Sequence, residues 1–301
     1  MSVIGSLTMG LLRAVKPGKG SFSDPEKLKE KARRENESFS FSYPKNRKAE
    51  YRLLNGTERE CLIIDPVRRK NMDKAILYIY GGVTNKWKKQ RPMAVGYALR
   101  TGTEVWYPVY PSMTEAPVGL TVKYLTDIYR LMTDVYDPKK IVVCGVSMGG
   151  AYALQIINAV NRLYPELPMP GLVLAHSPGG WPVNEDDWER YRAYEKRDPL
   201  FSESDLRMTL KMTIHGKSSS DRCLYPSLGD FRNAPPTYIY YGEEMLAGCA
   251  PLYKKAYEKS GEADKIHIRI TKNMMHAYSC LPVFPESRKS YNETIGLIEG
   301  L

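Results

Sequence analysis

Short apolar segments and longer amphipathic segments alternate along most of the chain. Between the short segments, residues 118–136 and 150–164 carry apolar residues at a helical period. The short segments are rich in β-branched and aromatic residues, and most are apolar throughout, as in parallel strands covered on both faces; they are residues 75–80, 104–110, 140–146, 171–176, 237–241 and 265–271. This alternation predicts an α/β fold with a mostly parallel sheet.

Two regions depart from the alternation. Residues 49–54 and 60–65 flank Asn55-Gly56, a dipeptide typical of hairpin turns, and predict an antiparallel start to the sheet. Residues 181–233 are long, charged and partly helical. We expect them to form an insertion over the sheet edge where a ligand enters.

The N-terminal segment predicts two helices. Residues 1–16 are mildly apolar, but no positive charge precedes their apolar part, so we expect a short helix against the body of the protein rather than a secretory signal. Residues 23–26 (Ser-Asp-Pro-Glu) have the features of a helix start. The helix that follows, over 26–37, has only Leu28 and Ala32 to bury and should pack weakly.

Composition places the chain among folded proteins. Its 301 residues are 43% hydrophobic and 26% charged, and no run of eighteen apolar residues exists that could span a membrane as a helix. The cysteines are odd in number and lack CxxC spacing, which favours a reducing compartment such as the cytoplasm. We expect Cys144 to lie in the core and Cys280 to be a small apolar filler; the others are Cys61, Cys223 and Cys249.

The net charge of +10 is unevenly distributed. Residues 1–100 hold 22 Lys and Arg against 10 Asp and Glu, whereas the remainder holds 22 against 24. The basic clusters at 68–70 and 86–89 are short, and no nucleic-acid-binding motif accompanies them. We therefore interpret them as solvated faces rather than a nucleic-acid surface.

The segment Gly145-Val146-Ser147-Met148-Gly149 matches the pattern GxSxG between a predicted strand and a predicted helix. A serine on so tight a turn needs small neighbours, and the helix N-terminus behind it favours developing negative charge. Ser147 is therefore a candidate nucleophile. The alternative is a glycine-rich turn that only brings the helix close to the sheet.

Candidate partners of Ser147 follow later strands. Glu243 and Glu244 come directly after 237–241, and His276 follows 265–271, in the chain order nucleophile, acid, histidine. The position of the two adjacent glutamates does not decide between them. The other histidines fit less well: His176 precedes the acid, and we expect His215 and His267 to be structural.

Together these residues resemble the hormone-sensitive-lipase-like carboxylesterases of the α/β-hydrolase superfamily, from about residue 51 onward. The resemblance implies an α/β-hydrolase fold, and it favours Glu244 as the acid because the family's acid is followed by one residue and then a leucine, as in Glu244-Met245-Leu246. The motifs that carry it are Tyr80-Gly81-Gly82-Val83, Tyr110-Pro111, 145–150, Asp198-Pro199-Leu200, Pro235-Pro236 and Met275-His276.

The family's oxyanion motif is His-Gly-Gly-Gly, and here it reads Tyr80-Gly81-Gly82-Val83. The resemblance implies that the backbone N–H groups of Gly82, Val83 and Met148 form the oxyanion hole, since valine keeps the backbone donor. Val83 adds bulk near the expected acyl position, which favours short acyl groups. How Tyr80 holds the loop in place of histidine is left open.

These observations predict a single α/β-hydrolase domain over 1–301, with a helical cap formed by about 1–48 and 181–233. We expect a serine carboxylesterase that acts on small esters through an acyl-serine, with no cofactor, no metal, no nucleic-acid partner and no membrane span; a homodimer is left open. One alternative is a hydrolase-fold ligand-binding protein without turnover. Another is the same chemistry on lactones, amides or acetylated small molecules.

The basic excess suggests a further hypothesis. Lys86, Lys88 and Lys89 come just after the expected oxyanion loop. If they lie at the entrance to the site, they bias the enzyme toward anionic esters.

Overall fold

The structure, a computed structural model, describes residues 3–16, 20, 24–37, 48–54, 57, 59–84, 87–214, 225 and 228–301. The predicted turn at Asn55-Gly56, together with His215 and Cys223, lies outside these residues. Among the helices that are described, none has the length and apolar character needed to cross a membrane.

The core is one eight-stranded sheet with the order β1-β2-β4-β3-β5-β6-β7-β8. β1 pairs with β2, and β2 with β4, in antiparallel fashion, whereas all later pairs are parallel. All eight strands overlap predicted segments, although β3 begins four residues earlier than predicted. Their bounds are β1 Ala49–Leu53, β2 Cys61–Pro66, β3 Asn71–Ile79, β4 Thr103–Pro108, β5 Ile141–Val146, β6 Leu172–His176, β7 Thr237–Gly242 and β8 Ile266–Thr271. The predicted mostly parallel sheet is confirmed.

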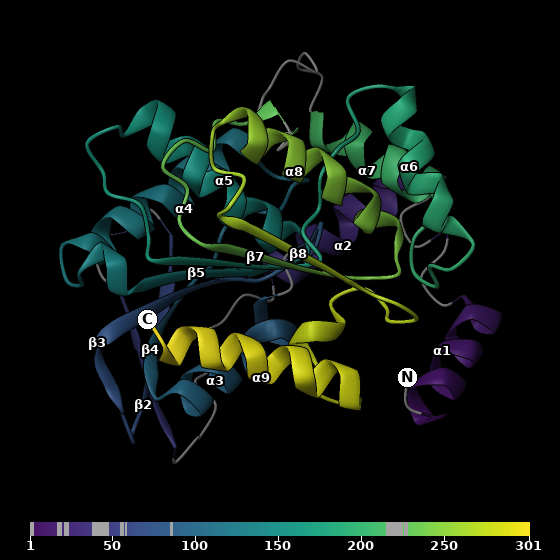
Figure 1. The fold of residues 1–301 in the computed structure, drawn as a ribbon. Coiled ribbons are helices and arrows are strands. Elements are labelled where there is room, and N and C mark those ends of the chain that lie inside the picture. The colour runs from purple at the N-terminus through teal and green to yellow at the C-terminus, as the bar shows by residue number, and fades with distance from the viewer. Residues whose placement is uncertain are drawn as a thin grey trace.

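Helices cover both faces of the sheet. α3 and α9 lie on one face, and α4, α5 and α8 lie on the other (Figure 1). Their bounds are α3 Trp87–Thr101, α4 Val118–Thr133, α5 Met148–Leu163, α8 Ala250–Lys259 and α9 Pro285–Glu299. The central strand β5 is buried along its whole length, whereas the edge strand β8 alternates between half-buried and exposed residues.

Two details of the predicted helices are wrong. α4 ends at Thr133, so Val135 lies beyond it and is exposed; Leu120, counted on the apolar face, is also exposed. α5 begins two residues earlier than expected, and its last apolar residue, Leu163, is exposed. In both helices, some apolar residues that fit the helical period lie outside the buried face or beyond the end of the helix.

The remaining helices gather where the parallel strands finish (Figure 1). They are α2 Pro25–Glu37, α6 Glu185–Glu195 and α7 Glu203–Ile214, with α1 Val3–Val15 further out. On α2, the two apolar residues that we expected to be buried, Leu28 and Ala32, are both buried.

Candidate active site

Ser147 occupies the sharp turn between β5 and α5 with φ 58° and ψ −123°, a conformation that costs a non-glycine residue free energy. The flanking glycines explain why this turn forms. A Cβ on Gly145 would lie 2.1 Å from the carbonyl oxygen of Gly149, and a Cβ on Gly149 would lie 2.1 Å from that of Ile79. Ser147 N–H donates to the carbonyl of His176 at 2.8 Å, which fixes the turn to β6.

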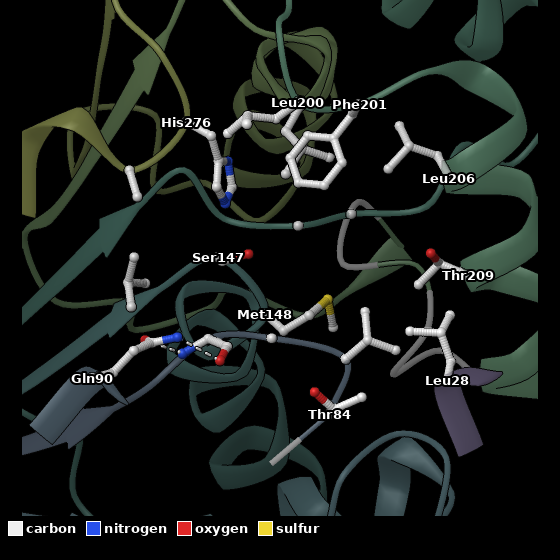
Figure 2. A pocket seen from close by; sticks show the side chains of 18 of the residues that line it. Leu28, Thr84, Gln90, Ser147, Met148, Leu200, Phe201, Leu206, Thr209 and His276 are labelled. Atoms are coloured by element: carbon white, nitrogen blue, oxygen red, sulfur yellow. Dashed lines mark hydrogen bonds between the residues drawn. The ribbon is translucent and has the colours of Figure 1, made fainter. Parts of the chain in front are cut away.

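His276 and Glu244 meet across two loops that follow β8 and β7. The Nδ1 of His276 lies 2.5 Å from Oε2 of Glu244. The Glu244 side chain is completely buried, and the imidazole is 12% exposed. Its ring points toward Ser147 (Figure 2). The structure thus brings Ser147, Glu244 and His276 to one place.

Ser177 is a site residue that the sequence reasoning missed. Its hydroxyl donates to Oε1 of Glu244 and accepts from the backbone N–H of Ala277 at 2.9 Å. Gly242 N–H also donates to Oε1, at 3.2 Å. The sequence did contain a signal for this residue. Ser177 directly follows the carboxyl end of β6, at the same edge of the sheet as the loops that carry Glu244 and His276.

The carboxylate of Glu243 links its own loop to three other segments of the chain. Its carboxylate forms an ion pair with Arg197 at 2.6 Å and lies 3.7 Å from Arg13 of α1. It also accepts from the backbone N–H of Asn273 in the loop that carries His276, at 3.1 Å. Arg13 in turn donates to Oδ1 of Asn273 at 2.9 Å. The adjacent glutamates therefore have different partners.

Asp198 links the predicted insertion to the Glu244 loop. Its Oδ2 accepts from Met245 N–H at 2.8 Å, and its Oδ1 accepts from Leu200 N–H at 2.7 Å and Phe201 N–H at 3.1 Å. Burial, and then the nearby Glu244 carboxylate, raise the pKa of Asp198. The Asp-Pro-Leu motif thus anchors the segment that carries Leu200 and Phe201.

The loop after β3 is held by two pairs of side-chain hydrogen bonds. Gln90 accepts from Gly81 N–H and donates to the Gly81 carbonyl, both at 2.8 Å (Figure 2). Tyr80 donates to the carbonyl of Tyr110 at 3.1 Å, while the Tyr110 hydroxyl donates to that of Tyr80. The two rings stack with centroids 4.2 Å apart. Tyr80 therefore anchors the loop by an interlocked tyrosine pair.

Beyond this anchor the loop turns through Gly82, whose φ of 119° is accessible almost only to glycine. A Cβ on Gly81 would lie 2.7 Å from the Cβ of Ser147, so glycine is also needed there for the loop to approach the serine. Within the described part of the chain, the N–H groups of Gly82 and Val83 have no hydrogen-bond acceptor.

A cavity of about 380 Å³ opens above Ser147. The ring of Phe201 meets His276 edge-on, with centroids 5.0 Å apart. Figure 2 shows Ser147 and Met148 in the middle of the cavity, Gln90 toward one end and Leu28 and Thr209 toward the other. The lining residues are Leu28, Lys31, Gly81, Gly82, Val83, Thr84, Gln90, Met93, Val146, Ser147, Met148, Gly179, Gly180, Trp181, Leu200, Phe201, Leu206, Thr209, Leu246, His276 and Ala277.

Other candidate residues lie elsewhere. His176 is fully buried between the Tyr97 hydroxyl at 3.0 Å and the Ser279 hydroxyl at 2.8 Å, and burial lowers its pKa to about 3. His267 is exposed and stacks on Tyr238 of β7. His176 and His267 are absent from the cavity wall.

Of the other side chains that sequence reasoning singled out, Cys144 and Cys280 are buried as predicted, and burial raises the pKa of the Cys144 thiol to about 12. Lys88 and Lys89 are exposed on α3 and do not line the cavity, and Lys86 lies outside the described residues. Among the residues that the structure describes, no three His, Cys, Asp or Glu side chains cluster in a way that could hold a metal ion.

One curated relative matches only part of the chain. The acetyl-coenzyme A carboxylase carboxyl transferase subunit alpha of Coxiella burnetii is 28% identical over 125 residues, which is 41% of this chain. The chain spans 37% of that protein's length, so the likeness is confined to a minority of each sequence.

Solved structures match over nearly the whole chain. The esterase EstE5, in crystals soaked with p-nitrophenyl butyrate, superposes with a TM-score of 0.79 at 17% identity, covering 100% of this chain and 99% of that one. An esterase from the bacterial hormone-sensitive lipase family gives 0.79 at 20% identity, covering 100% and 98%. A putative esterase from Staphylococcus aureus gives 0.74 at 23% identity, covering 92% of each chain.

The family comparison agrees with the topology. The model of a family described as having the alpha/beta hydrolase fold matches residues 76–279, which is more than half of the chain. This range includes the Ser147 turn and both partner loops. The resemblance drawn from the sequence motifs and the predicted fold class are thereby confirmed, and the chain belongs to the α/β-hydrolase fold family.

Proposed function

We propose that the protein is a serine carboxylesterase in which Ser147, Glu244 and His276 are the catalytic residues. One observation carries the proposal: the imidazole of His276 is held by the buried Glu244 and points toward Ser147, which sits on a strained turn at the N-terminus of α5. Side chains from three separate loops thus converge in the roles of a nucleophile, an acid and a base, in that chain order. Esterases among the structural relatives support the same chemistry.

The mechanism follows from these roles. The Ser147 hydroxyl oxygen attacks the ester carbonyl while His276 takes the hydroxyl proton. Glu244, held by Ser177 and Gly242, keeps the proton of His276 on Nδ1 and stabilises the imidazolium. When the tetrahedral intermediate collapses, His276 gives its proton to the departing alcohol. Water, activated by the same histidine, then releases the acid from the acyl-serine.

The backbone N–H groups of Gly82, Val83 and Met148 would stabilise the oxyanion of the tetrahedral intermediate. Two observations support this. The N–H groups of Gly82 and Val83 have no hydrogen-bond acceptor among the described residues, and Met148 lies at the start of α5, where the helix dipole favours negative charge. Each such donor contributes about a hundred- to a thousandfold in rate. The Gln90 clamp on Gly81 holds this loop before substrate arrives.

We also propose a preference for short acyl groups. Val83 stands in the cavity wall where the family pattern has a glycine, and its side chain is only 7% exposed, so it already fills space beside the expected acyl position. Nitrophenyl esters of acetate, butyrate, octanoate and laurate would test this. We expect kcat/KM to fall beyond butyrate, and a maximum at laurate would contradict the argument.

The cap is proposed to comprise the N-terminal segment and about residues 181–233, on a single domain. Leu28 and Lys31 from α2, and Leu200, Phe201, Leu206 and Thr209 from the insertion, close the cavity from one side. The cysteine pattern favours a reducing compartment, and we propose the cytoplasm.

Ser147→Ala tests the mechanism. We expect the variant to lose nearly all turnover of p-nitrophenyl butyrate and its labelling by a fluorophosphonate probe, with an unchanged melting temperature, because alanine keeps the turn's backbone. Turnover that survives the substitution would rule out Ser147 as the nucleophile. A wild-type protein that neither reacts with the probe nor hydrolyses any ester would instead favour a ligand-binding protein.

The two glutamates provide a matched pair of variants for the acid. Glu244→Gln removes the charge beside His276, and we expect a loss in kcat of about 10³- to 10⁴-fold. Glu243→Gln weakens the links to Arg13, Arg197 and the Asn273 main chain but leaves Glu244 beside His276, so we expect less than about a tenfold loss. Equal or reversed losses would overturn the assignment of Glu244.

A further inference from the structure

The part of the cavity wall that the structure describes is mostly apolar and contains one charged side chain. Of the described residues that line it, Lys31 is the only Lys or Arg, and none is Asp or Glu. Lys31 comes three residues after Leu28 on α2, and both residues line the cavity. Figure 2 shows Leu28 at the end of the cavity away from Gln90. Lys31 is exposed, so this cation lies where the cavity wall meets the solvent, and no described acidic residue shares the wall with it.

The neighbours of Lys31 on α2 are already paired. Lys29 contacts Glu26 at 2.9 Å, and both Arg33 and Arg34 contact Glu30, at 2.9 Å and 2.8 Å. No described residue forms an ion pair with Lys31. Its ammonium group is thus available to a ligand, while its aliphatic stem extends the apolar wall begun by Leu28.

A second unpartnered donor lies in the same wall. The hydroxyl of Thr84 is buried without a hydrogen-bond partner among the described residues, and the residue is only 3% exposed. Thr84 follows Val83 in the loop after β3 and lies, like Leu28, away from Gln90 (Figure 2). A buried hydroxyl without a partner costs free energy unless a bound group satisfies it.

We propose that Lys31 and Thr84 form a subsite for a carboxylate of the substrate, remote from the ester that is cleaved. A carboxylate can accept from both an ammonium and a hydroxyl group, whereas an alkyl chain would leave both unsatisfied. The substrates favoured are therefore carboxylate-bearing esters, such as monoesters of dicarboxylic acids or acyl esters of hydroxy acids. The inference rests on the proposed esterase function, whose substrate class it narrows.

The test compares charged esters with neutral twins of the same shape. One pair, 4-carboxyphenyl acetate and its methyl ester, carries the charge on the alcohol side. The other, the p-nitrophenyl monoester of adipic acid and its methyl ester, carries it on the acyl side. We expect Lys31→Ala to lower kcat/KM about tenfold for the charged member of at least one pair and less than twofold for the neutral members. The responding pair identifies the side on which the carboxylate binds.

Three controls isolate the subsite. Lys29→Ala removes a neighbouring, paired lysine of α2 and should leave the charged-to-neutral ratio unchanged. Thr84→Val keeps the shape but removes the hydroxyl, and should lower the ratio by about three- to fivefold. In the wild type, 0.5 M NaCl should lower the ratio, because the interaction is electrostatic. Unchanged ratios in both Lys31→Ala and Thr84→Val, or equal losses on charged and neutral esters, would overturn the proposal.

Binding to the Ser147→Ala variant separates this inference from the esterase proposal. Calorimetric titration with monomethyl adipate and dimethyl adipate needs no turnover. Tighter binding of the charged compound, abolished by adding Lys31→Ala, would support the subsite even if the wild type hydrolysed no ester. Equal affinity for both compounds would contradict the subsite even if ester hydrolysis were established.

Discussion

The two sides of the cavity are held by different interactions. On the sheet side, residues 80–84, 145–150 and 272–277 are fixed by backbone contacts and buried hydrogen bonds, with glycines wherever a Cβ would meet main chain. On the cap side, α6 and α7 are joined largely by exposed ion pairs, in which Arg192 and Arg207 both contact Glu185 and Glu203. The groups proposed to react with the ester thus lie on the more rigid side.

This difference separates the two tasks of the site. Close backbone contacts cannot be adjusted by small movements, so they preserve the distances that proton transfer and oxyanion binding require. Exposed ion pairs contribute little to stability and re-form easily. The ion-pair positions of α6 and α7 can therefore change in sequence without disturbing the chemistry, provided that the links of Asp198 to Met245 and of Arg197 to Glu243 are kept.

The largest expected effect comes from Gly149→Ala on the sheet side. Its Cβ would lie 2.1 Å and 2.3 Å from the carbonyl oxygens of Ile79 and Tyr80, neither of which can move without shifting β3. We expect a loss of at least about 3 kcal/mol in the free energy of unfolding, measured in urea, or no soluble protein. Gly296→Ala in α9, where a Cβ meets nothing within 4 Å, is the control and should be neutral or stabilising.

The next effect concerns acid stability and His176, beneath the Ser147 turn. Its pKa of about 3 in the folded protein lies below the ordinary value of 6.5, because burial disfavours the imidazolium. The unfolded chain therefore binds a proton that the folded protein does not. The stabilisation is complete above pH 6.5 and is lost as the pH falls toward 3, by up to about 1.4 kcal/mol per pH unit.

Urea unfolding at several pH values measures this loss. His176→Gln should flatten the decline below pH 6.5 relative to the wild type, whatever its own stability at neutral pH. His267→Gln, at an exposed site on β8, should leave the wild-type slope intact. Identical slopes in all three proteins would show that other groups govern the acid transition.

A smaller effect is expected from Tyr110→Phe, which removes one hydrogen bond of the interlocked pair at the buried carbonyl of Tyr80. We expect a loss of about 1–2 kcal/mol in unfolding free energy. Because Tyr80 begins the loop that carries Gly82 and Val83, kcat should fall more than KM rises. A stable variant with unchanged kcat would show that Gln90 alone holds the loop.

The smallest effect is expected on the cap side. Arg192→Ala breaks contacts at 2.6 Å and 2.7 Å with Glu203 and Glu185, yet all three side chains keep some contact with solvent, at 38% exposed for Arg192, 21% for Glu203 and 67% for Glu185. The melting temperature should change by no more than about 2 °C, and 0.5 M NaCl should reduce even this difference. A drop as large as that for Tyr110→Phe would mean that the two sides of the cavity do not differ in the way described.

The difference between the sheet side and the cap side of the cavity also explains how much of the fold and of the site could be predicted from the sequence. The strands and the Ser147 turn could be predicted, because burial on both faces and a tight turn restrict which residues occur there. His276 followed from its place after a strand, whereas the choice of Glu244 over Glu243 came only from the family resemblance. The interlock of Tyr80 with Tyr110 could not, since the two residues are 30 positions apart and meet only through the register of β3 and β4. Ser177 was missed because a serine after a strand is common.

On the cap side, less could be predicted. The insertion at 181–233 was recognisable by its broken alternation, but nothing in its pattern indicated which side chains enter the cavity. Among the described residues, the lysine that lines the cavity is Lys31 of α2, whereas Lys88 and Lys89 of α3 do not line it. Proximity in sequence to the loop after β3 was a poor guide to proximity in space.

The carboxylate of Glu243 has a consequence for protein engineering. It bridges Arg13 near the N-terminus, Arg197 before α7 and the main chain of the loop bearing His276. A chimera that takes its cap from another esterase would have to retain a cation at positions 13 and 197. Without these cations, the new cap would no longer be held in position relative to the loop that carries His276. Swapping the two arginines and Glu243 together with the cap, as one module, is the design that this bridge recommends.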